Sequence, residues 1–384
     1  MLNKKSMLQA QIAATDPAEA VRMFYDAVYQ PETALVLFFC SSSYCLETIE
    51  AEMTRLFGDV PVVGCTTAGE IGPEGYGYGT ITGASFSADC FCGAIRCFGP
   101  LKQFDTASCQ SGIQELLLEQ EEHSPWPSTG NSFGFLLIDG LSRQEETVAR
   151  AVQAALGRIP LVGGSAADSL DFNKTWLFSN GHFRTDCAVL VLITTPLPFK
   201  PLMIQHFISS EQRAVVTSAD TGQRIVHEID GRPAAVTYAE LTGVKAADLS
   251  PAHFAASPVA LRICGNDYVR GISEKLPDGS LSFYCAVDEG VVLRTTKTVD
   301  LIQNLMDSFA ALRNEIGPVQ MIIGCDCILR RLEAEQSGLG AEVATILKQN
   351  QVVGFNTYGE QYRGIHVNQT FTGIAIGTGA GETT

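Results

Sequence analysis

Three stretches of this sequence resemble one another: VPVVGCTTAGEI at residues 60–71, IPLVGGSAADSL at 159–170 and QVVGFNTYGEQ at 351–361. Each has an apolar pair, then a glycine, then small residues that carry hydroxyl or amide groups. The residues that coincide two positions after the aligned glycines are Thr66, Ser165 and Asn356. Self-similarity of this kind is typical of a repeated structural unit, so the chain is predicted to contain three copies of one.

The residues around each stretch match as well. A short apolar strand pattern leads through a polar loop into a helical pattern, and the Val-Val-Gly strand follows. Further strand-like runs come after each glycine, so each unit has the pattern β-α-β-β, in places with one more strand. We therefore predict an α/β (α+β) fold in which repeated β-α-β-β units form packed mixed sheets with helices on the outer faces, rather than a doubly wound parallel sheet.

The stretch between Lys200 and Gly317 lacks this repeat. It contains two turn signals, Asp230-Gly231 and KLPDGS at residues 275–280. A chain of 384 residues is long enough for two domains, and we place the boundary near residue 235. The predicted parts are a lead-in segment at 1–29, an N-terminal domain at 30–235, a C-terminal domain at 236–376 and a polar, glycine-rich tail at 377–384.

The composition argues against several classes of protein. The chain is 46% hydrophobic with a formal net charge of −16, whereas a nucleic-acid surface needs clustered Lys and Arg. No apolar run approaches the roughly 18 residues of a membrane span, and the N-terminus lacks an apolar signal-peptide core. We therefore expect a cytoplasmic protein that binds neither nucleic acid nor membrane. Its 12 cysteines lie mostly in apolar runs and are expected to be reduced and buried.

Several longer motifs occur in order along the chain. They are VVGCTTAGEIGPEGYGYGTITG (62–83), LIDGLSRQEE (137–146), PLVGGSAADSLDF (160–172), RIVHEIDGRPAAVTYAELTG (224–243), CDCILRRLE (325–333) and VVGFNTYGEQYRGIHVNQTFTGIAIG (352–377). Together they resemble the FIST sensory family, with its N-terminal and C-terminal FIST domains. The segment PLMIQHFISSEQRAVVTSAD, residues 201–220, is similar to part of the bacterial nitric-oxide-sensing FIST haemoproteins.

The resemblance implies an intracellular, non-enzymatic ligand sensor. It implies that the module works with a histidine kinase or a cyclic-di-GMP enzyme, either fused to it or on a separate chain. Because this sequence shows no such segment, we expect the output on another chain, and a homo-oligomer is an open expectation. From the narrower resemblance we expect non-covalent haem b as the cofactor and nitric oxide as the diatomic ligand.

His206 is the first candidate for the axial ligand of the haem iron. If PLMIQHFIS is one strand, His206 lies on the same face as Leu202, Ile204 and Ile208, and a neutral imidazole in an apolar wall suits a haem iron. The alternative is a core histidine whose ring is satisfied by a carbonyl oxygen. Met203 and Tyr25 are possible second iron ligands, although nothing in the sequence selects them.

His366 is the second candidate, within the polar stretch that runs from Glu360 to Thr370. Strand alternation would place His366, Asn368 and Thr370 on one polar face, which is either the wall of a ligand pocket or a solvated sheet face. The corresponding strand of the earlier copies is taken to be TITGASF and KTWLFSN, which lack such a face. We therefore predict a ligand-binding site here that also includes Tyr362, whereas the preceding Asn356 is interpreted as part of a structural turn.

The segment CDCILRRLE places Asp326, Cys327 and Arg330 between an apolar strand and a helix. Asp326 is expected to cap the helix, with ligand binding as the alternative. Arg330 suits a carboxylate, including a haem propionate or an amino acid. Cys90, Cys92 and Cys97 lack the spacing of a metal cluster and are interpreted as buried strand cysteines, with Cys97 on the face opposite to the other two.

Two further functions stay open. One is a haem-free FIST receptor for a small organic ligand such as an amino acid, bound by Arg330, Glu360 and the His366 face. The other is a hydrolase or transferase with Ser165 as nucleophile, although GGSAAD does not match Gly-x-Ser-x-Gly.

Overall fold

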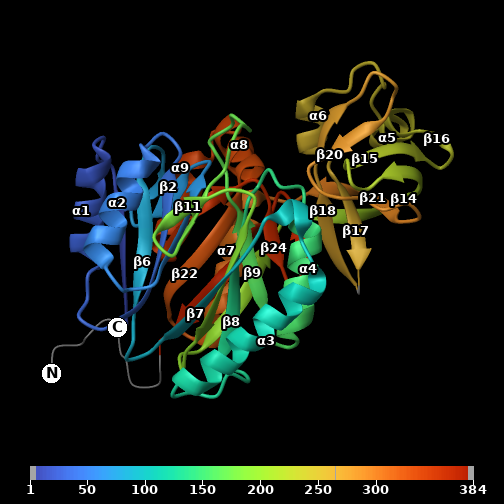
Figure 1. The fold of residues 1–384 in the computed structure, drawn as a ribbon. Coiled ribbons are helices and arrows are strands. Elements are labelled where there is room, and N and C mark those ends of the chain that lie inside the picture. The colour runs from blue at the N-terminus through green and yellow to red at the C-terminus, as the bar shows by residue number, and fades with distance from the viewer. Residues whose placement is uncertain (1–5, 264, 379–384) are drawn as a thin grey trace. The chain divides into compact units, whose positions relative to one another are not determined.

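The computed structural model describes residues 6–263 and 265–378. In this part of the chain the residues form two compact units and four sheets, of which three are mixed and one is antiparallel (Figure 1). The first unit is made of residues 6–203, 306–365 and 371–378, and the second of 204–263, 265–305 and 366–370.

The three sheets of the first unit have the same strand order. The first sheet is ordered β1 (Met7–Ile12), β6 (Ile81–Ser87), β2 (Thr33–Ser41), β3 (Val62–Thr67), β10 (Leu177–Ser179) and β11 (His182–Arg184). The second is ordered β7 (Cys92–Phe98), β12 (Ala188–Thr194), β8 (Ser132–Ile138), β9 (Leu161–Ser165), β24 (Glu360–Tyr362) and β25 (Ile365–Val367). The third is ordered β13 (Phe199–Ile204), β26 (Phe371–Gly377), β22 (Val319–Cys327), β23 (Val352–Thr357), β4 (Glu70–Gly72) and β5 (Gly75–Gly77). The sequence repeat is therefore a structural repeat.

The short hairpin of each repeat pairs with the edge of a sheet whose other strands belong mainly to a different repeat. Strand β4 of the first repeat pairs with β23 of the third, and β24 of the third pairs with β9 of the second. Strand β10 of the second repeat pairs with β3 of the first. In Figure 1 the red strand β24 accordingly lies beside the green strand β9. This cyclic exchange ties three distant parts of the sequence into one body.

The glycine shared by the three repeats lies where two parallel strands approach each other closely. A Cβ atom on Gly354 would lie 1.7 Å from the carbonyl oxygen of Gly324. On Gly163 it would lie 1.9 Å from the carbonyl oxygen of Leu136. A Cβ atom on Gly64 would likewise clash with the carbonyl oxygen of Phe38. Because no side chain fits at these distances, close backbone contact explains the Val-Val-Gly motif.

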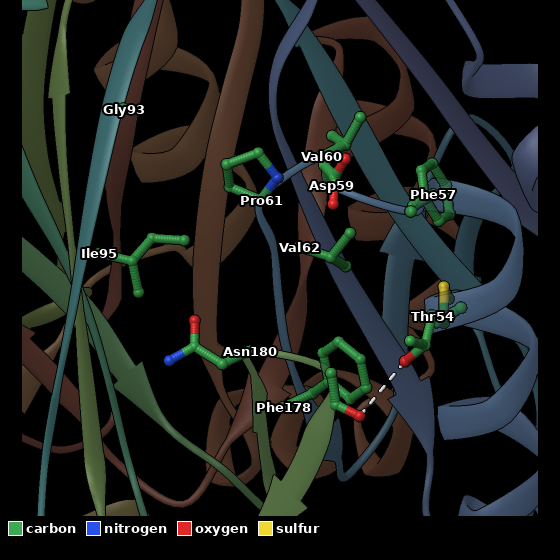
Figure 2. A pocket seen from close by; sticks show the side chains of 13 residues that line it. Thr54, Phe57, Asp59, Val60, Pro61, Val62, Gly93, Ile95, Phe178 and Asn180 are labelled. Carbon is green, nitrogen blue, oxygen red and sulfur yellow. Dashed lines mark hydrogen bonds between the residues drawn. The ribbon is translucent and has the colours of Figure 1, made fainter.

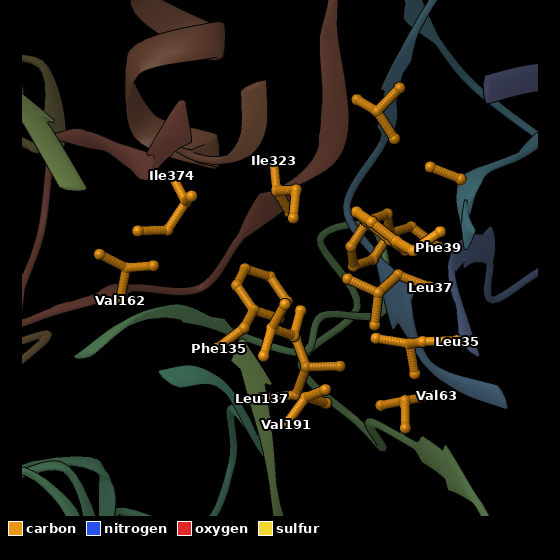
Figure 3. Close-up of a cluster of buried hydrophobic side chains, with 14 of the residues drawn as sticks. Leu35, Leu37, Phe39, Val63, Phe135, Leu137, Val162, Val191, Ile323 and Ile374 are labelled. Atoms are coloured by element: carbon orange, nitrogen blue, oxygen red, sulfur yellow. The ribbon is translucent and has the colours of Figure 1, made fainter. Parts of the chain in front are cut away.

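The inner faces of the three sheets meet in one apolar core. Figure 3 shows Leu37 and Phe39 of the first sheet, Phe135 and Leu137 of the second and Ile323 of the third within this cluster. All five side chains are at most 1% exposed. The predicted arrangement, with sheets packed on one another through one face, is confirmed.

Helices cover the outer faces of these sheets, as predicted. The helices α1 and α2 pack on the first sheet, α3 and α4 on the second, and α8 and α9 on the third. Their bounds, with those of α7 and a short 3-10 helix, are Pro17–Val28 (α1), Leu46–Phe57 (α2), Thr106–His123 (α3), Glu145–Leu156 (α4), Leu301–Ile316 (α7), Ile328–Gln336 (α8), Gly340–Gln349 (α9) and Leu101–Gln103 (3-10). In the described residues, no helix is both long enough and apolar enough to cross a membrane.

Local sequence explains where these helices begin and which face they bury. In α1, the side chain of Asp16 accepts a hydrogen bond of 2.7 Å from the backbone N–H of Glu19, and Pro17 occupies the first helical turn. An N-cap aspartate followed by proline is a strong start signal. Val21, Phe24 and other residues at helical spacing are then completely buried against the first sheet.

The second unit is built around the fourth sheet. Its order is β18 (Asn266–Arg270), β17 (Val259–Ile263), β21 (Val292–Thr298), β14 (Phe207–Asp220), β15 (Ile225–Ile229), β20 (Leu281–Phe283) and β19 (Ile272–Lys275), with β16 (Arg232–Pro233) beside β15. Two helices, α5 (Ala234–Thr242) and α6 (Pro251–Ala256), pack on its core. The predicted Asp230-Gly231 turn joins β15 to β16, with φ angles of 52° and 69°, so this hairpin prediction is confirmed. Most of the predicted tail, from residue 379 onward, lies outside the described residues.

Candidate functional site

The three repeated turns of the first unit hydrogen-bond to one another through their backbones. The N–H of Ala68 donates to the carbonyl oxygen of Asn356 at 3.0 Å, and the N–H of Asn356 donates to that of Gly69 at 2.7 Å. The other pairs are Ser165 N to Gly359 O (2.8 Å), Tyr358 N to Ser165 O (3.2 Å), Ala167 N to Thr66 O (3.0 Å) and Ser169 N to Thr67 O (3.0 Å). Each turn thus supports the other two. Ser165 belongs to the second of these three turns and is completely buried. Its hydroxyl accepts a hydrogen bond of 2.9 Å from the side-chain amide of Gln361.

Two of the turns are closed by a buried glutamate. Glu70 accepts hydrogen bonds from the hydroxyl groups of Thr67, at 2.5 Å, and Thr80, at 2.7 Å. Burial raises the pKa of Glu70, and the hydrogen bonds from Thr67 and Thr80 oppose that rise. Glu360 repeats the arrangement, because it accepts a hydrogen bond of 2.5 Å from the hydroxyl of Thr357. The structure therefore places Glu360, predicted as a ligand-binding residue, in a turn-closing position.

A buried ion pair of the third repeat is hydrogen-bonded to a tyrosine of the first repeat. Oδ1 of Asp326 accepts a hydrogen bond of 2.9 Å from Nε of Arg330, and both side chains are at most 4% exposed. Oδ2 of Asp326 accepts a hydrogen bond of 2.6 Å from the hydroxyl of Tyr76. Burial and the neighbouring Asp326 carboxylate raise the pKa of Tyr76. Arg330 is therefore already paired with a carboxylate of its own chain.

The expectation that Asp326 caps the following helix is wrong. Asp326 belongs to strand β22, and helix α8 begins at Ile328 with Cys327 at the N-cap position and no side-chain hydrogen bond there. The carboxylate instead binds Arg330 and Tyr76. Cys327, predicted as a ligand residue, is 1% exposed at this junction.

Two tyrosines that sequence reasoning missed enclose Arg331. Its guanidinium carbon lies 4.4 Å from the ring centroid of Tyr76 and 3.6 Å from that of Tyr78. Its Nη1 donates a hydrogen bond of 2.7 Å to Oδ1 of Asn356, and its Nε donates one of 3.0 Å to Glu335. The signal was the Gly-Tyr-Gly-Tyr-Gly alternation, because residues two apart in an extended segment point to the same side.

The second repeat has a different polar cluster. The hydroxyl of Tyr358 donates a hydrogen bond of 2.5 Å to Oδ1 of Asp168, and its ring stacks on Phe172 at 4.4 Å. Backbone N–H groups of Asn173 and Lys174 donate to Oδ2 of Asp168 at 2.8 and 2.7 Å. These partners lie within the protein, as do those of the turns and the Asp326 ion pair.

A polar set in the second unit differs, because some of its atoms lack such partners. Arg270, at the end of β18, is 5% exposed, and its Nη1 donates to the carbonyl oxygens of Val269 at 3.1 Å and His366 at 3.2 Å. Its Nε has no hydrogen-bond partner among the described residues. Both polar atoms of the Asn368 side chain and Oε1 of Gln369 are also unpartnered within that part of the chain. We call Arg270, Asn368 and Gln369 the Arg270 cluster.

An unpartnered buried polar group is costly. Asn368 is 0% exposed and Gln369 is 1% exposed, and the one described side-chain hydrogen bond of Gln369 goes from Nε2 to the carbonyl oxygen of Ala255 at 3.0 Å. Leaving such a group without a partner costs about 1–3 kcal/mol. A set of them in one place is the arrangement expected where a ligand supplies the missing hydrogen bonds. Sequence reasoning found Asn368 but missed Arg270.

The structure corrects the predicted polar face around His366. Strand β25 ends at Val367, and Gln369 has a φ of 53°, so the chain turns before β26 begins at Phe371. His366, Asn368 and Thr370 are at most 1% exposed, which excludes a solvated face. The spacing from Gly359 to Thr370 equals that from Gly69 to Thr80. The counterparts of His366 and Asn368 in the first repeat are therefore Tyr76 and Tyr78, not residues of TITGASF.

The strand expected around His206 is interrupted. β13 ends at Ile204 and β14 begins at Phe207, so Ile208 is 54% exposed rather than buried on the face of Ile204. His206 itself is 1% exposed, and its ring centroid lies 4.2 Å from that of Phe207. Met203, one suggested second iron ligand, is half-buried in β13, and Tyr362 is partly buried against the core of the first unit.

Two cavities of the first unit are wide enough for a small molecule. One, of about 400 Å³, is lined by residues of α2, β7 and β10, and Figure 2 shows Phe57 and Val62 facing Ile95 with Asn180 at one end. The other, of about 660 Å³, lies at Pro196–Phe199 and 316–318. Neither is lined by His206 or His366.

A haem needs an axial histidine that faces a slot wide enough for the macrocycle. His206 is buried and packs on Phe207, and it is not among the residues that line the two cavities. Arg330, predicted to bind a propionate, is paired with Asp326.

Comparison with known proteins identifies the family. Residues 34–232 match the FIST N domain, and residues 234–363 match the FIST C domain. The two matches cover nearly the whole chain and define a sensory, ligand-binding protein. The chain belongs to the FIST family.

One curated relative has low sequence identity. The chain is 22% identical over 277 residues to the uncharacterized protein MJ1623 of Methanocaldococcus jannaschii. The match covers 64% of this chain and 54% of the relative, so it spans about half of the length of that protein.

Proposed function

We propose that this FIST protein is a sensor for a small molecule that carries a carboxylate group, and that the Arg270 cluster binds it. The observation that carries the proposal is the buried guanidinium of Arg270. Its described hydrogen bonds go only to two carbonyl oxygens, and its charge has no ion-pair partner among the described residues. A planar guanidinium pairs well with a carboxylate, often through two parallel hydrogen bonds.

Asn368 adds specificity for the rest of the ligand. Its side chain offers one acceptor and two donors, and all are unpartnered in the described chain. Such a group suits an amino or hydroxyl group next to the carboxylate, as in amino acids and hydroxy acids. A site built for these groups rejects analogues that lack them, because its buried polar atoms would then stay unpaired.

The position of the Arg270 cluster in the chain suggests how ligand binding is transmitted to the rest of the protein. The segment 366–370 belongs to the second unit and continues directly into β26 of the third sheet. A ligand that bonds to Asn368 acts on this connecting segment and favours the conformation that binds it best. We propose that a partner chain, a histidine kinase or a cyclic-di-GMP enzyme, responds to that change.

A thermal-shift screen of the purified chain tests the proposal. The probes are individual amino acids and short mono- and dicarboxylates at millimolar concentration. Ligands that bind only the native state raise the unfolding temperature, so we expect a rise for a chemically related subset. Arg270→Met should abolish the rise. Arg262→Met, in the same sheet but 41% exposed at its side chain, should keep it. No rise with any probe would overturn the proposal.

The haem hypothesis stays a prediction with its own test. If this chain takes up haem b and senses nitric oxide, the protein should bind stoichiometric haem and show a Soret band. His206→Ala should remove that band, and His366→Ala should keep it. This result would replace the carboxylate proposal.

A further inference from the structure

Cys97 and Cys187 lie together at the ends of two neighbouring strands of the second sheet. Strands β7 and β12 are antiparallel, and Cys97 is directly opposite Val189. Cys187, two residues before Val189, is therefore the diagonal neighbour of Cys97 on the same face. Both side chains also pack in the same apolar core of the first unit. Sequence reasoning noticed Cys97 only as the odd member of a cysteine-rich strand.

The surroundings of Cys97 favour its thiolate. The hydrogen bond from Cys187 is the largest influence and lowers the pKa of Cys97; burial opposes it, and the charge of Arg184 and hydrogen bonds from Ser179 and Arg184 lower it further. The pKa of Cys187 is raised, first by donating that hydrogen bond, then by burial and by the neighbouring charge of Asp139. The two pKa values are shifted in opposite directions, so Cys97 loses its proton at a lower pH than Cys187 does.

Other buried cysteines lack this environment. Burial raises the pKa of Cys40, Cys65 and Cys325, which are 0% exposed in the apolar core. The thiolate is the reactive form of cysteine, so these three are expected to be inert.

Cys97 is also accessible to a small reagent. Its side chain is only partly buried. The cavity of about 400 Å³ is lined by Gly93 and Ile95, which precede Cys97 on the same face of β7. It is also lined by Asn180 (Figure 2), and the preceding residue, Ser179, lowers the pKa of Cys97. The wall of this cavity therefore includes chain neighbours of Cys97.

We propose that Cys97 and Cys187 form a peroxide-reactive dithiol. The thiolate of Cys97 attacks one oxygen of the peroxide, an S–O bond forms as the O–O bond breaks, and the leaving oxygen takes up a proton as water or an alcohol. Cys97 is thereby oxidised by two electrons to a sulfenic acid, and the peroxide is reduced by two. The sulfur of Cys187 then attacks Cys97, the S–S bond forms, and the S–O bond breaks. The hydroxyl group leaves with the proton of Cys187 as water.

Treatment of the full chain with a slight molar excess of hydrogen peroxide tests this. Peptide mapping without reductant should show a disulfide between Cys97 and Cys187, a loss of two free thiols, and recovery of both after reduction. Cys187→Ala should instead trap a sulfenic acid on Cys97, which dimedone labels. Because Cys187→Ala removes the hydrogen bond to the thiolate, the rate should then reach half of its maximum at a higher pH than in the wild type.

Cys45 is the matched control, because it is exposed and lies at the N-cap of α2. Cys45→Ser should leave the rate and the product unchanged, and Cys97→Ser should abolish the disulfide. A circular dichroism spectrum equal to that of the wild type shows that each variant is folded. Oxidation of Cys45 before Cys97, or two intact thiols at Cys97 and Cys187 after treatment, would overturn the proposal.

Discussion

The hydroxyl of Tyr76 donates a hydrogen bond of 2.6 Å to Oδ2 of Asp326, which lies 250 residues later in the chain. The same carboxylate is paired with Arg330, and the ring of Tyr76 packs on Arg331. One hairpin of the first repeat thus completes a buried polar network of the third. This contact shows how the exchange of hairpins holds the three repeats together.

Removing either partner of this contact should destabilise the first unit by different amounts. Asp326→Ala leaves the charge of Arg330 buried and unpaired, which should cost about 3–5 kcal/mol. Tyr76→Phe loses one hydrogen bond to a charged group and should cost about 1.5–3 kcal/mol. Urea unfolding of the full chain measures both. Glu52→Ala, in an exposed pair with Arg55, should change little. Equal, small effects for the three variants would contradict the network.

The raised pKa of Tyr76 predicts a loss of stability in alkali. Its folded-state pKa lies above the value of about 10 expected when unfolded, so its contribution is fully present below pH 10 and is lost as the pH rises further. The slope is at most about 1.4 kcal/mol per pH unit for one proton. The stability advantage of the wild type over Tyr76→Phe should therefore shrink above pH 10. A constant difference from pH 8 to pH 11.5 would show that Tyr76 does not titrate in this way.

The glycine of the repeat should tolerate no side chain. In Gly354→Ala, the new methyl group would meet the carbonyl oxygen of Gly324, so the parallel strands would have to separate. We expect a loss of more than about 3 kcal/mol of unfolding free energy, or no folded protein. Gly112→Ala is the control. Gly112 lies within helix α3, and its new methyl group would lie 3.6 Å from the side chain of Phe98, an ordinary contact distance. That substitution should stabilise the helix by about 0.5–1 kcal/mol. Similar effects for the two variants would contradict the explanation of the motif.

The repeat and the fold class were predictable because they depend on local patterns. Apolar periodicity and the Val-Val-Gly motif are visible within about 12 residues of sequence. The exchange of hairpins was not predictable, because pairing between β4 and β23 leaves no local signal. The face assigned to His366 was wrong because a turn at Gln369 interrupts the alternation. Arg270 was missed because a lack of partners is a property of the folded structure.

Asn368 should destabilise the protein when no ligand is bound. In Asn368→Leu, a residue of similar size removes two unpartnered polar atoms, so the free energy of unfolding should stay the same or rise by up to about 2 kcal/mol. Asn356→Leu is the matched control. Asn356 is also 0% exposed, but its Oδ1 accepts a hydrogen bond from Arg331, so its loss should cost at least about 2 kcal/mol. A comparable loss in Asn368→Leu would show that Asn368 has a structural role.

The most direct test of the carboxylate-sensor proposal is isothermal titration calorimetry. The probe is the carboxylate that raises the unfolding temperature most in the screen. We expect saturable binding of one molecule per chain by the wild type, and binding weaker by at least about tenfold in Arg270→Met. Arg262→Met should bind as the wild type does. Equal affinity of Arg270→Met and the wild type, or no saturable binding by the wild type, would contradict the assignment of the Arg270 cluster as the ligand site.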